Sequence, residues 1–324
     1  MALQTNSDTL ITVFGGSGFL GRHVVRALAK RRYRIRAAVR RPELAGHLPP
    51  LGTVGQIHTV QANLRYPRSV EAAVRDASVV INLVGILFER GRQSFDSVQQ
   101  YGAEQVALAA SAFGARVIHV SAIGADENSP SAYAQSKAKG EQAVFAAAPN
   151  ATVIRPSILF GPEDGFFNRF AAMARMMPAL PLVGGGQTKF QPVFVGDVAE
   201  AIADLVEQKS GGGKTYEFGG PEVRTFRELM EYVLATTERS RLLLPVPFWL
   251  AKLQGYFLQF LPNPPLTPDQ VDMLKVDNVV SEASIRDGLT LQGLGLTPTS
   301  YEAIVPSYLW RFRKTGQFRA DRFA

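Results

Sequence analysis

The sequence predicts an α/β fold, a doubly wound parallel sheet followed by a smaller C-terminal portion. Short apolar strands alternate with alanine-rich helical stretches over the first half of the 324 residues. Strands such as residues 77–84 are apolar without alternation, which indicates burial on both faces of a sheet. A glycine-rich turn joins the first strand to the first helix. Together these observations indicate a Rossmann domain.

Each element is expected from its apolar pattern and its flanking turn residues. The expected strands are 9–14, 34–39, 56–60, 78–83, 116–121 and 152–155. The expected helices are 19–31, 68–75, 96–112 and 131–147.

The composition of the chain changes near residue 160, where glycine and proline become frequent. A helix near 196–207 and a strand near 214–218 are expected to return to the sheet. We therefore divide the chain into an NAD(P)-binding domain, 1–218, with a small insertion near 161–193, and a C-terminal substrate or docking portion, 219–324.

The first candidate site is the turn Gly15-Gly16-Ser17-Gly18-Phe19-Leu20-Gly21. Glycines let the backbone turn sharply and approach a phosphate, and the amino end of a helix favours an anion. A strand, a glycine turn and a helix in this order form the pyrophosphate site of a dinucleotide. We predict that these residues bind such a cofactor; the alternative is a glycine-rich loop without a ligand.

The end of the second strand indicates which dinucleotide is bound. Strand 34–39 runs into Arg40-Arg41-Pro42, and the first acidic residue after it is Glu43. NAD sites place an acid at the strand end, whereas a 2′-phosphate requires positive charge there. Because a guanidinium pairs well with phosphate, we predict NADP(H), with Arg40 as its main contact. The alternative is a solvated arginine.

Composition and charge exclude several classes of function. The absence of cysteine excludes disulfides, cysteine-ligated metals and thiol catalysis, and the four histidines show no metal-ligand spacing, so no metal site is predicted. The net charge is +7, concentrated between residues 22 and 41 and in 311–323. This charge suits an anionic membrane or protein surface, or is simply solvated. No nucleic-acid motif occurs, so no nucleic-acid partner is expected.

Residues 242–261 are apolar, but Pro245, Pro247 and Lys252 argue against a membrane-spanning helix. From Phe248 onward, large apolar residues recur at helical spacing, namely Trp249, Leu253, Tyr256, Phe257 and Phe260. Such a helix either covers the core or a pocket, or lies on a membrane or a partner. The sequence leaves both readings open.

Several short motifs occur in a familiar order: the glycine turn, Arg40, Asn63-Leu64, Asn82-Leu83-Val84-Gly85, Tyr133-Ala-Gln-Ser-Lys137 and Arg155-Pro156. Over residues 9–237 the chain therefore resembles short-chain dehydrogenases/reductases of the extended or atypical type. Segments 80–88, 119–126, 155–162 and 261–270 resemble, more narrowly, the NADPH-binding accessory subunits of respiratory complex I, NADH:ubiquinone oxidoreductase.

This resemblance implies a tightly held NADPH and a position beside the membrane, with peripheral complex I subunits and the membrane surface as partners. The first eight residues show no signal peptide, so we expect a cytoplasmic protein on the cytoplasmic face of the inner membrane, equivalent to the matrix side in mitochondria. The cofactor contacts that it implies beyond the glycine turn and Arg40 are Asn63 and Leu64 near the adenine, Leu83, Val84 and Gly85 along the nucleotide, and Pro156, Ser157 and Ile158 near the nicotinamide.

The resemblance also names candidate catalytic residues. Tyr133 and Lys137 share a helix face, and in the reductase mechanism the tyrosine exchanges a proton while the lysine favours the phenolate. Ser121 is the candidate third group, and all three would also contact the cofactor. Two positions depart from the family pattern: Ile123 replaces a hydroxyl, and Gln99-Gln100-Tyr101 replaces an asparagine.

Two functions follow. The first is an accessory or assembly subunit of complex I with a structural NADP(H). The alternative is an NADPH-dependent reductase acting on an apolar substrate, such as a quinone or a ubiquinone-biosynthesis intermediate. The missing hydroxyl and asparagine favour the first.

Overall fold

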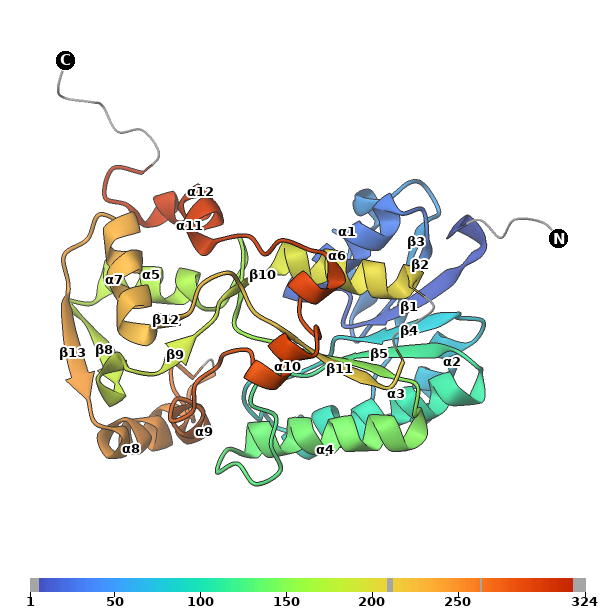
Figure 1. Ribbon diagram of the computed structural model, residues 1–324, viewed down its shortest axis with the longest axis horizontal. Helices are drawn as coiled ribbons and strands as arrows, with labels where there is room; N and C mark the ends of the chain where they lie inside the picture. Colours follow the sequence, from blue (N-terminus) through green and yellow to red (C-terminus); the bar gives the residue numbers. More distant parts are fainter. Residues whose placement is uncertain (1–5, 209–211, 263, 317–324) are drawn as a thin grey trace, which may run out of the picture. The chain divides into compact units, whose positions relative to one another are not determined.

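The computed structural model describes residues 6–208, 212–262 and 264–316, and within them the chain forms two compact units (Figure 1). The first unit contains the chain through Pro156, Val195–Phe218 and Glu282–Leu296. The second contains Ser157–Phe194, Gly219–Ser281 and the described chain from Thr297. The insertion expected near 161–193 thus belongs to the second unit, and residues 282–296, expected in the C-terminal portion, belong to the first.

A seven-stranded parallel sheet forms the centre of the first unit, in the order β11-β6-β5-β4-β1-β2-β3. The direction of the strand order reverses at β1, between β4 and β2, and open sheets of this kind bind ligands at such a reversal. The prediction of a doubly wound α/β fold is confirmed. The strands are β1 (Leu10–Phe14), β2 (Arg34–Val39), β3 (Ile57–Gln61), β4 (Val79–Asn82), β5 (Arg116–Val120), β6 (Thr152–Pro156) and β11 (Lys214–Phe218).

Helices cover both faces of this sheet (Figure 1). On one face α1 (Phe19–Lys30) packs against α6 (Val195–Glu207). Arg31, directly after α1, strengthens that contact through Glu200 at 3.0 Å and Asp204 at 2.6 Å. The other face carries a cluster of buried alanines and valines beneath α2 (Pro67–Val74), α3 (Tyr101–Ala112) and α4 (Ala132–Ala147).

Most strand and helix ends of this unit lie within one residue of the predicted ones; the helix expected at 96–112 is the exception. It begins with a π-helical turn, η4 (Asp96–Gln100), before α3. A Cβ on Gly140 of α4 would overlap the carbonyl oxygen of Gln99, so only glycine permits this close approach. The side chain of Gln99 is buried at this turn. Turns of this kind are frequent at functional sites.

The second unit has short paired strands and an aromatic core. Strand β7 pairs with β10, β8 with β13, and β9 with β12. Asp164 is buried and accepts hydrogen bonds from the Tyr308 hydroxyl at 2.5 Å and from the backbone N–H groups of Phe166 and Asn168, both at 3.0 Å. This carboxylate therefore ties the C-terminal helices to the start of α5.

The remaining strands are β7 (Leu159–Phe160), β8 (Ala179–Val183), β9 (Lys189–Phe190), β10 (Val193–Phe194), β12 (Arg224–Thr225) and β13 (Leu242–Val246). The remaining α-helices are α5 (Phe167–Met176), α7 (Phe226–Thr236), α8 (Phe248–Leu258), α9 (Pro268–Met273), α10 (Glu282–Arg286), α11 (Tyr301–Ile304) and α12 (Pro306–Leu309). Single 3-10 turns lie at Asn6–Asp8, Pro42–Leu44, Pro49–Leu51, Gly184–Gly186, Gln292–Leu294 and Trp310–Phe312.

Candidate dinucleotide-binding site

The glycine turn is held tightly between the sheet and α1. Gly15 adopts φ +77° and its N–H donates to the Ala38 carbonyl at 3.1 Å. The N–H of Gly18 donates back to the Gly15 carbonyl at 3.0 Å. A Cβ on Gly21 would overlap that same carbonyl oxygen, so α1 packs on the turn at a distance that only glycine allows.

The amino end of α1 suits a pyrophosphate. Its N-cap residue is Gly18, no side chain caps it, and no acidic residue lies in its first turn. The positive end of the helix dipole therefore stands at the carboxyl edge of β1, where the strand order reverses. A dinucleotide fits this turn because Gly15, Gly16 and Gly18 let phosphates approach the backbone closely.

The residues after β4 lie directly beside the glycine turn. The N–H of Leu83 donates to the Phe14 carbonyl at 3.0 Å, and a Cβ on Gly15 would stand 3.3 Å from Val84 Cγ2. The N–H of Val84 is held by the side-chain oxygen of Asn82 at 3.1 Å. The structure thus brings together the glycine turn and the residues predicted to line the nucleotide.

The residues predicted for the adenosine half follow β2 and β3. Arg40 is exposed, and its guanidinium donates to the side-chain oxygen of Gln93. Asn63 accepts a hydrogen bond from the Arg65 N–H at 3.2 Å. Leu64 is buried, and a Cβ on Gly102 of α3 would stand 2.9 Å from its own Cβ. All three predicted residues lie at the carboxyl edge of the sheet; their contact with a cofactor stays a prediction.

Lys137 is buried beside Gly85. Its Nζ donates to the Val120 carbonyl at 3.2 Å, and a Cβ on Gly85 would stand 3.2 Å from that nitrogen. Burial disfavours the charged form and lowers the pKa of Lys137 to about 8, although the carboxylate of Glu141 acts in the opposite direction. The ammonium therefore stands at the ends of β4 and β5 in a poorly solvated environment.

Tyr133 and Ser121 flank the same region. Tyr133 lies one turn before Lys137 on α4, buried, with its ring edge-to-face against Phe95 at 5.9 Å. The N–H of Ser121 extends the sheet by donating to the Ile154 carbonyl at 2.7 Å. Its Oγ is buried and has no hydrogen-bond partner within the part of the chain that the structure describes. The catalytic roles of these residues stay predictions.

Of the residues predicted near the nicotinamide, Pro156 ends β6 in the first unit, and Ser157 and Ile158 open the second. The side-chain oxygen of Asn278 accepts hydrogen bonds from the Ser157 hydroxyl at 2.7 Å and the Ile158 N–H at 3.2 Å. A place for these residues beside the nicotinamide remains a prediction.

The sequence placed His119 in the core of the fifth strand but did not predict that it faces Asn82 near Lys137. His119 and Asn82 are register partners on β5 and β4, and their side-chain nitrogens lie 3.2 Å apart. Burial, and then the charge of Lys137, lowers the pKa of His119 to about 3, so its imidazole is neutral. Gln99 donates to the Ser136 hydroxyl at 2.9 Å. The available signal was two polar residues, Asn82 and His119, within apolar strands.

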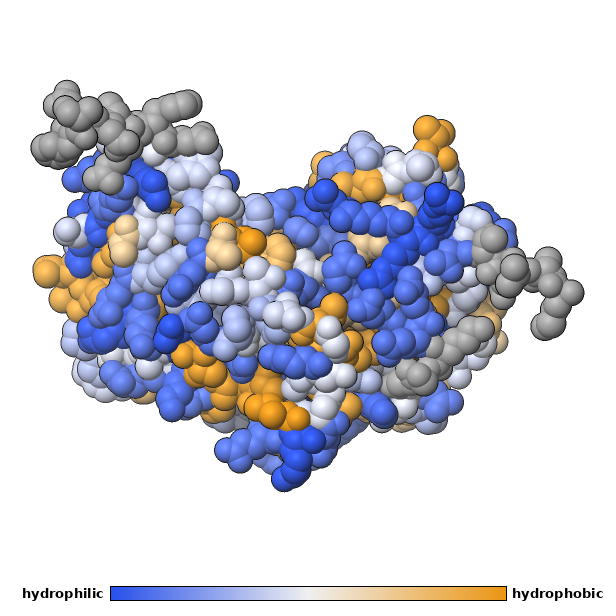
Figure 2. All heavy atoms as spheres, turned by 45° about the horizontal axis from the view of Figure 1, so that its top comes forward, coloured by the Kyte–Doolittle hydropathy of each residue, from blue (hydrophilic) through white to orange (hydrophobic). Residues whose placement is uncertain are grey.

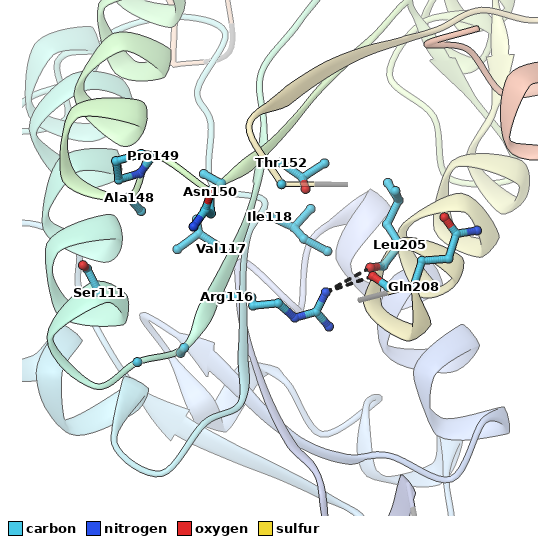
Figure 3. A pocket seen from close by; sticks show the side chains of 14 residues that line it. Ser111, Arg116, Val117, Ile118, Ala148, Pro149, Asn150, Thr152, Leu205 and Gln208 are labelled. Atoms are coloured by element: carbon cyan, nitrogen blue, oxygen red, sulfur yellow. Dashed lines mark hydrogen bonds between the residues drawn. The ribbon is translucent and has the colours of Figure 1, made fainter. Parts of the chain in front are cut away.

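A separate cavity lies at the opposite edge of the sheet (Figure 3). Its lining includes Arg116 at the start of β5 and Thr152 at the start of β6. The Arg116 guanidinium donates to the carbonyls of Val206 at 2.5 Å and Gln208 at 3.1 Å, at the end of α6. Since ligands of such sheets bind at the carboxyl ends of the strands, this cavity is not the dinucleotide site.

The sequence profile of the NAD dependent epimerase/dehydratase family matches residues 11–219, from β1 through β11. The chain belongs to the NAD dependent epimerase/dehydratase family. The resemblance to extended short-chain dehydrogenases/reductases is therefore confirmed. Within the described residues, no group of three histidine, aspartate or glutamate side chains could hold a metal ion.

Individual proteins that are similar to this chain indicate more narrowly which members of the family it resembles. The mitochondrial NADH dehydrogenase (ubiquinone) 1 alpha subcomplex subunit 9 of Arabidopsis thaliana is 37% identical over 323 residues, covering 96% of this chain and 79% of that protein. The ceramide reductase of Caulobacter vibrioides is 38% identical over 204 residues, covering 63% of this chain and 62% of that protein. The resemblance to complex I accessory subunits is confirmed.

Solved structures of low sequence identity show the same fold. The NADPH-dependent quinone oxidoreductase of Escherichia coli, solved with NADPH, superimposes with a TM-score of 0.73 at 19% identity. The match covers 93% of this chain and 99% of that one. This epimerase/dehydratase family member therefore shares the fold of that structure.

The buried lysine generates a prediction about pH. The variant Lys137→Met should exceed the wild type in free energy of unfolding by more at pH 7 than at pH 10. The unfolded lysine keeps its proton to about pH 10.4, whereas the folded one releases it near pH 8. Between these values the unfolded chain binds more protons, so wild-type stability rises with pH.

The advantage of methionine should shrink by roughly 1–3 kcal/mol between the two pH values, as measured by urea unfolding of both proteins. Lys139→Met, at an exposed position of the same helix, is the matched control. If the difference in unfolding free energy between the wild type and Lys137→Met stays constant with pH, the burial of this charge is contradicted.

Proposed function

We propose that this protein is an accessory or assembly subunit of respiratory complex I that holds NADP(H) as a structural cofactor. The observation that carries the proposal is the alignment with the Arabidopsis complex I subunit, which covers 96% of this chain. The likeness spans both units, so it includes the second unit as well as the nucleotide-binding sheet.

The arrangement around Lys137 supports a structural cofactor. Position 123, where extended reductases carry a hydroxyl, is the buried Ile123. Gln99-Gln100-Tyr101 stands where many reductases carry an asparagine, and the amide nitrogen of Gln99 donates to the Ser136 hydroxyl. Two of the four usual catalytic positions thus depart from the reductase pattern, whereas Tyr133 and Lys137 are present.

A structural role needs only binding to the folded state. A ligand that binds the native protein alone raises its stability by mass action, and the gain grows with affinity. The glycine turn joins β1 to α1, bonds to β2 at Ala38 and contacts the segment after β4 at Val84. A nucleotide held there would therefore stabilise the centre of the sheet.

We propose NADP(H) as the cofactor because of the charge at the end of β2. Arg40 is exposed at the carboxyl edge of the sheet, next to Arg41 and ahead of Glu43. A 2′-phosphate there would accept paired hydrogen bonds from the guanidinium.

Arg40→Ala should weaken NADP(H) binding by about ten- to a hundredfold and leave NAD(H) binding unchanged, because the lost contact is charge-assisted. Competitive titration with both nucleotides measures this. Arg68→Ala, at an exposed arginine of α2, is the control. Equal losses for both nucleotides, or tighter NAD(H) than NADP(H) binding by the wild type, would refute the assignment.

We place the protein on the cytoplasmic face of the inner membrane, or its matrix-side equivalent, in contact with peripheral subunits of the complex and with the membrane surface. Within the described residues, every helix is too short or too polar to cross a bilayer. The net charge of +7 suits an anionic surface.

Affinity purification tests the proposed assembly. The tagged full chain, isolated from its own cells in mild detergent, should bring down subunits of NADH:ubiquinone oxidoreductase. Deletion of the gene should reduce the assembled complex on native gels. A tagged chain that carries no such subunits, together with an unchanged complex in the deletion strain, would refute this function.

A second candidate is an NADPH-dependent reductase acting on an apolar substrate such as a quinone or a ubiquinone-biosynthesis intermediate. The observation that favours it is the placement of Tyr133 and Lys137 on α4 beside Ser121 at the end of β5. When bound, the nicotinamide supplies or accepts hydride. Tyr133 would exchange the proton on the substrate oxygen, and the nearby ammonium would favour its phenolate.

A further inference from the structure

Helix α8 (Phe248–Leu258) packs through its smallest residues. Ala251 and Gly255, one turn apart, are its two buried residues. A Cβ on Gly255 would stand 2.9 Å from the backbone of Thr267 and Pro268, so α8 lies directly against the start of α9. The inward face of this helix is therefore centred on small side chains, with the half-buried Phe248 packed beside them at its start.

The outward face carries the large residues. Spacings of four, three, one and three residues place them within roughly 100° around the helix axis, opposite Ala251 and Gly255. Their exposed fractions lie between 50% and 76%. We call this set the aromatic stripe: Trp249, Leu253, Tyr256, Phe257 and, just beyond the helix end, Phe260.

The aromatic rings at the end of the stripe contact one another. The Tyr256 ring stands edge-to-face with Phe257 at 5.7 Å and with Phe260 at 6.1 Å. Adjacent to α8 in the chain, β13 exposes Leu242 and Leu244, and Figure 2 shows apolar surface at the left edge, where Figure 1 draws β13. Contiguous exposed apolar surface of this kind marks an interaction site.

The chain segment that carries the stripe has charges of one sign. Between Glu238 and Asp269 the chain carries Arg239, Arg241 and Lys252 and no acidic residue. Lys252 lies beside the stripe and shares the carboxylate of Asp272 with Lys275, at 2.6 and 2.7 Å. Two ammonium groups on one carboxylate leave a net positive charge. The complement of this surface is therefore anionic as well as apolar.

At the other end of β13, Arg239 and Arg241 lie near Arg175 of α5. The pKa of Arg239 is lowered by burial and by the charges of these two neighbours. Arg241 also donates to the Ala174 carbonyl at 2.8 Å, which holds it beside α5. Cations thus precede β13 and lie within α8, on the same stretch of chain as the exposed apolar residues.

We propose that the aromatic stripe, with the exposed leucines of β13, lies in the headgroup layer of an anionic phospholipid bilayer. Tryptophan and tyrosine favour that depth, phenylalanine and leucine reach the acyl boundary, and lysine and arginine pair with lipid phosphates. A second copy of this chain is a poorer occupant, because a symmetric contact would bring Lys252 of both copies to the same apolar surface. The inference rests on the proposed position at the membrane and names the surface that meets it.

Tryptophan fluorescence tests this directly, because the chain has two tryptophans, Trp249 and Trp310. The full chain carrying Trp310→Phe reports on the stripe alone. Its emission should shift to the blue with vesicles of phosphatidylcholine and phosphatidylglycerol, and less with phosphatidylcholine alone. High salt should weaken the effect of the anionic lipid. The matched Trp249→Phe protein should show no shift.

Two double variants at exposed positions test whether vesicle binding requires the stripe or arises from nonspecific adsorption of apolar surface. Phe257→Ser with Phe260→Ser should lower partition onto the anionic vesicles by at least about tenfold, since both side chains would leave the acyl boundary. Leu108→Ser with Phe113→Ser, at positions 46% and 44% exposed in the first unit, should leave binding unchanged. Circular dichroism checks that both variants are folded.

Absence of vesicle binding, or equal binding by the two double variants, would overturn the inference. So would concentration-dependent dimerisation that Phe257→Ser with Phe260→Ser abolishes, because the stripe would then meet a second copy. The vesicles contain no protein. If the chain does not bind them but still co-purifies with complex I subunits, this inference alone is overturned. Vesicle binding without co-purification overturns the proposed subunit function alone.

Discussion

A side chain at Gly21 would overlap the carbonyl oxygen of Gly15, and this contact sets how α1 meets the sheet. The same carbonyl accepts the N–H of Gly18, while the N–H of Gly15 reaches Ala38 at the end of β2. The turn thus places closely approaching glycine backbone and the positive end of α1 at the reversal of strand order. The proposed dinucleotide site and the packing of α1 on the sheet use the same few atoms.

Near this turn, the core of the first unit contains buried polar groups that lower the free energy of unfolding. Lys137 is buried, His119 is held neutral, and the Oε1 of Gln99 lacks a hydrogen-bond partner within the described residues. Unsatisfied buried groups destabilise a fold by about 1–3 kcal/mol each. Ile123 and the stretch Gln99-Gln100-Tyr101 depart from the reductase pattern, and this departure is the reason that we propose a structural cofactor.

The local part of the fold could be predicted from the sequence, because strands and helices of the first unit are encoded in contiguous apolar runs. The π-helical turn at 96–100 could not, since it depends on Gly140, which is 40 residues away. The return of residues 282–296 to the first unit rests on long-range contacts such as the Glu217 N–H to the Leu289 carbonyl at 2.9 Å. No local pattern signals such a contact.

The same distinction holds for the sites. The glycine turn and Lys137 follow from motifs in fixed spacing, whereas the pairing of Asn82 with His119 required the register of β4 and β5. Helical spacing predicted the helix that begins at Phe248, but which of its faces is buried depends on α9. The sequence left open a core or an interface for this helix, and its exposed aromatic stripe favours the interface.

The central claim is that the glycine turn retains an NADP(H) that is not consumed. The most direct test is to purify the native full chain without added nucleotide, then identify what it releases on denaturation and how fast it exchanges with labelled NADPH. We expect near-stoichiometric NADP(H) and exchange far slower than any enzymatic turnover. Recovery of NAD(H), or of no nucleotide, or rapid exchange coupled to oxidation of a quinone, would contradict it.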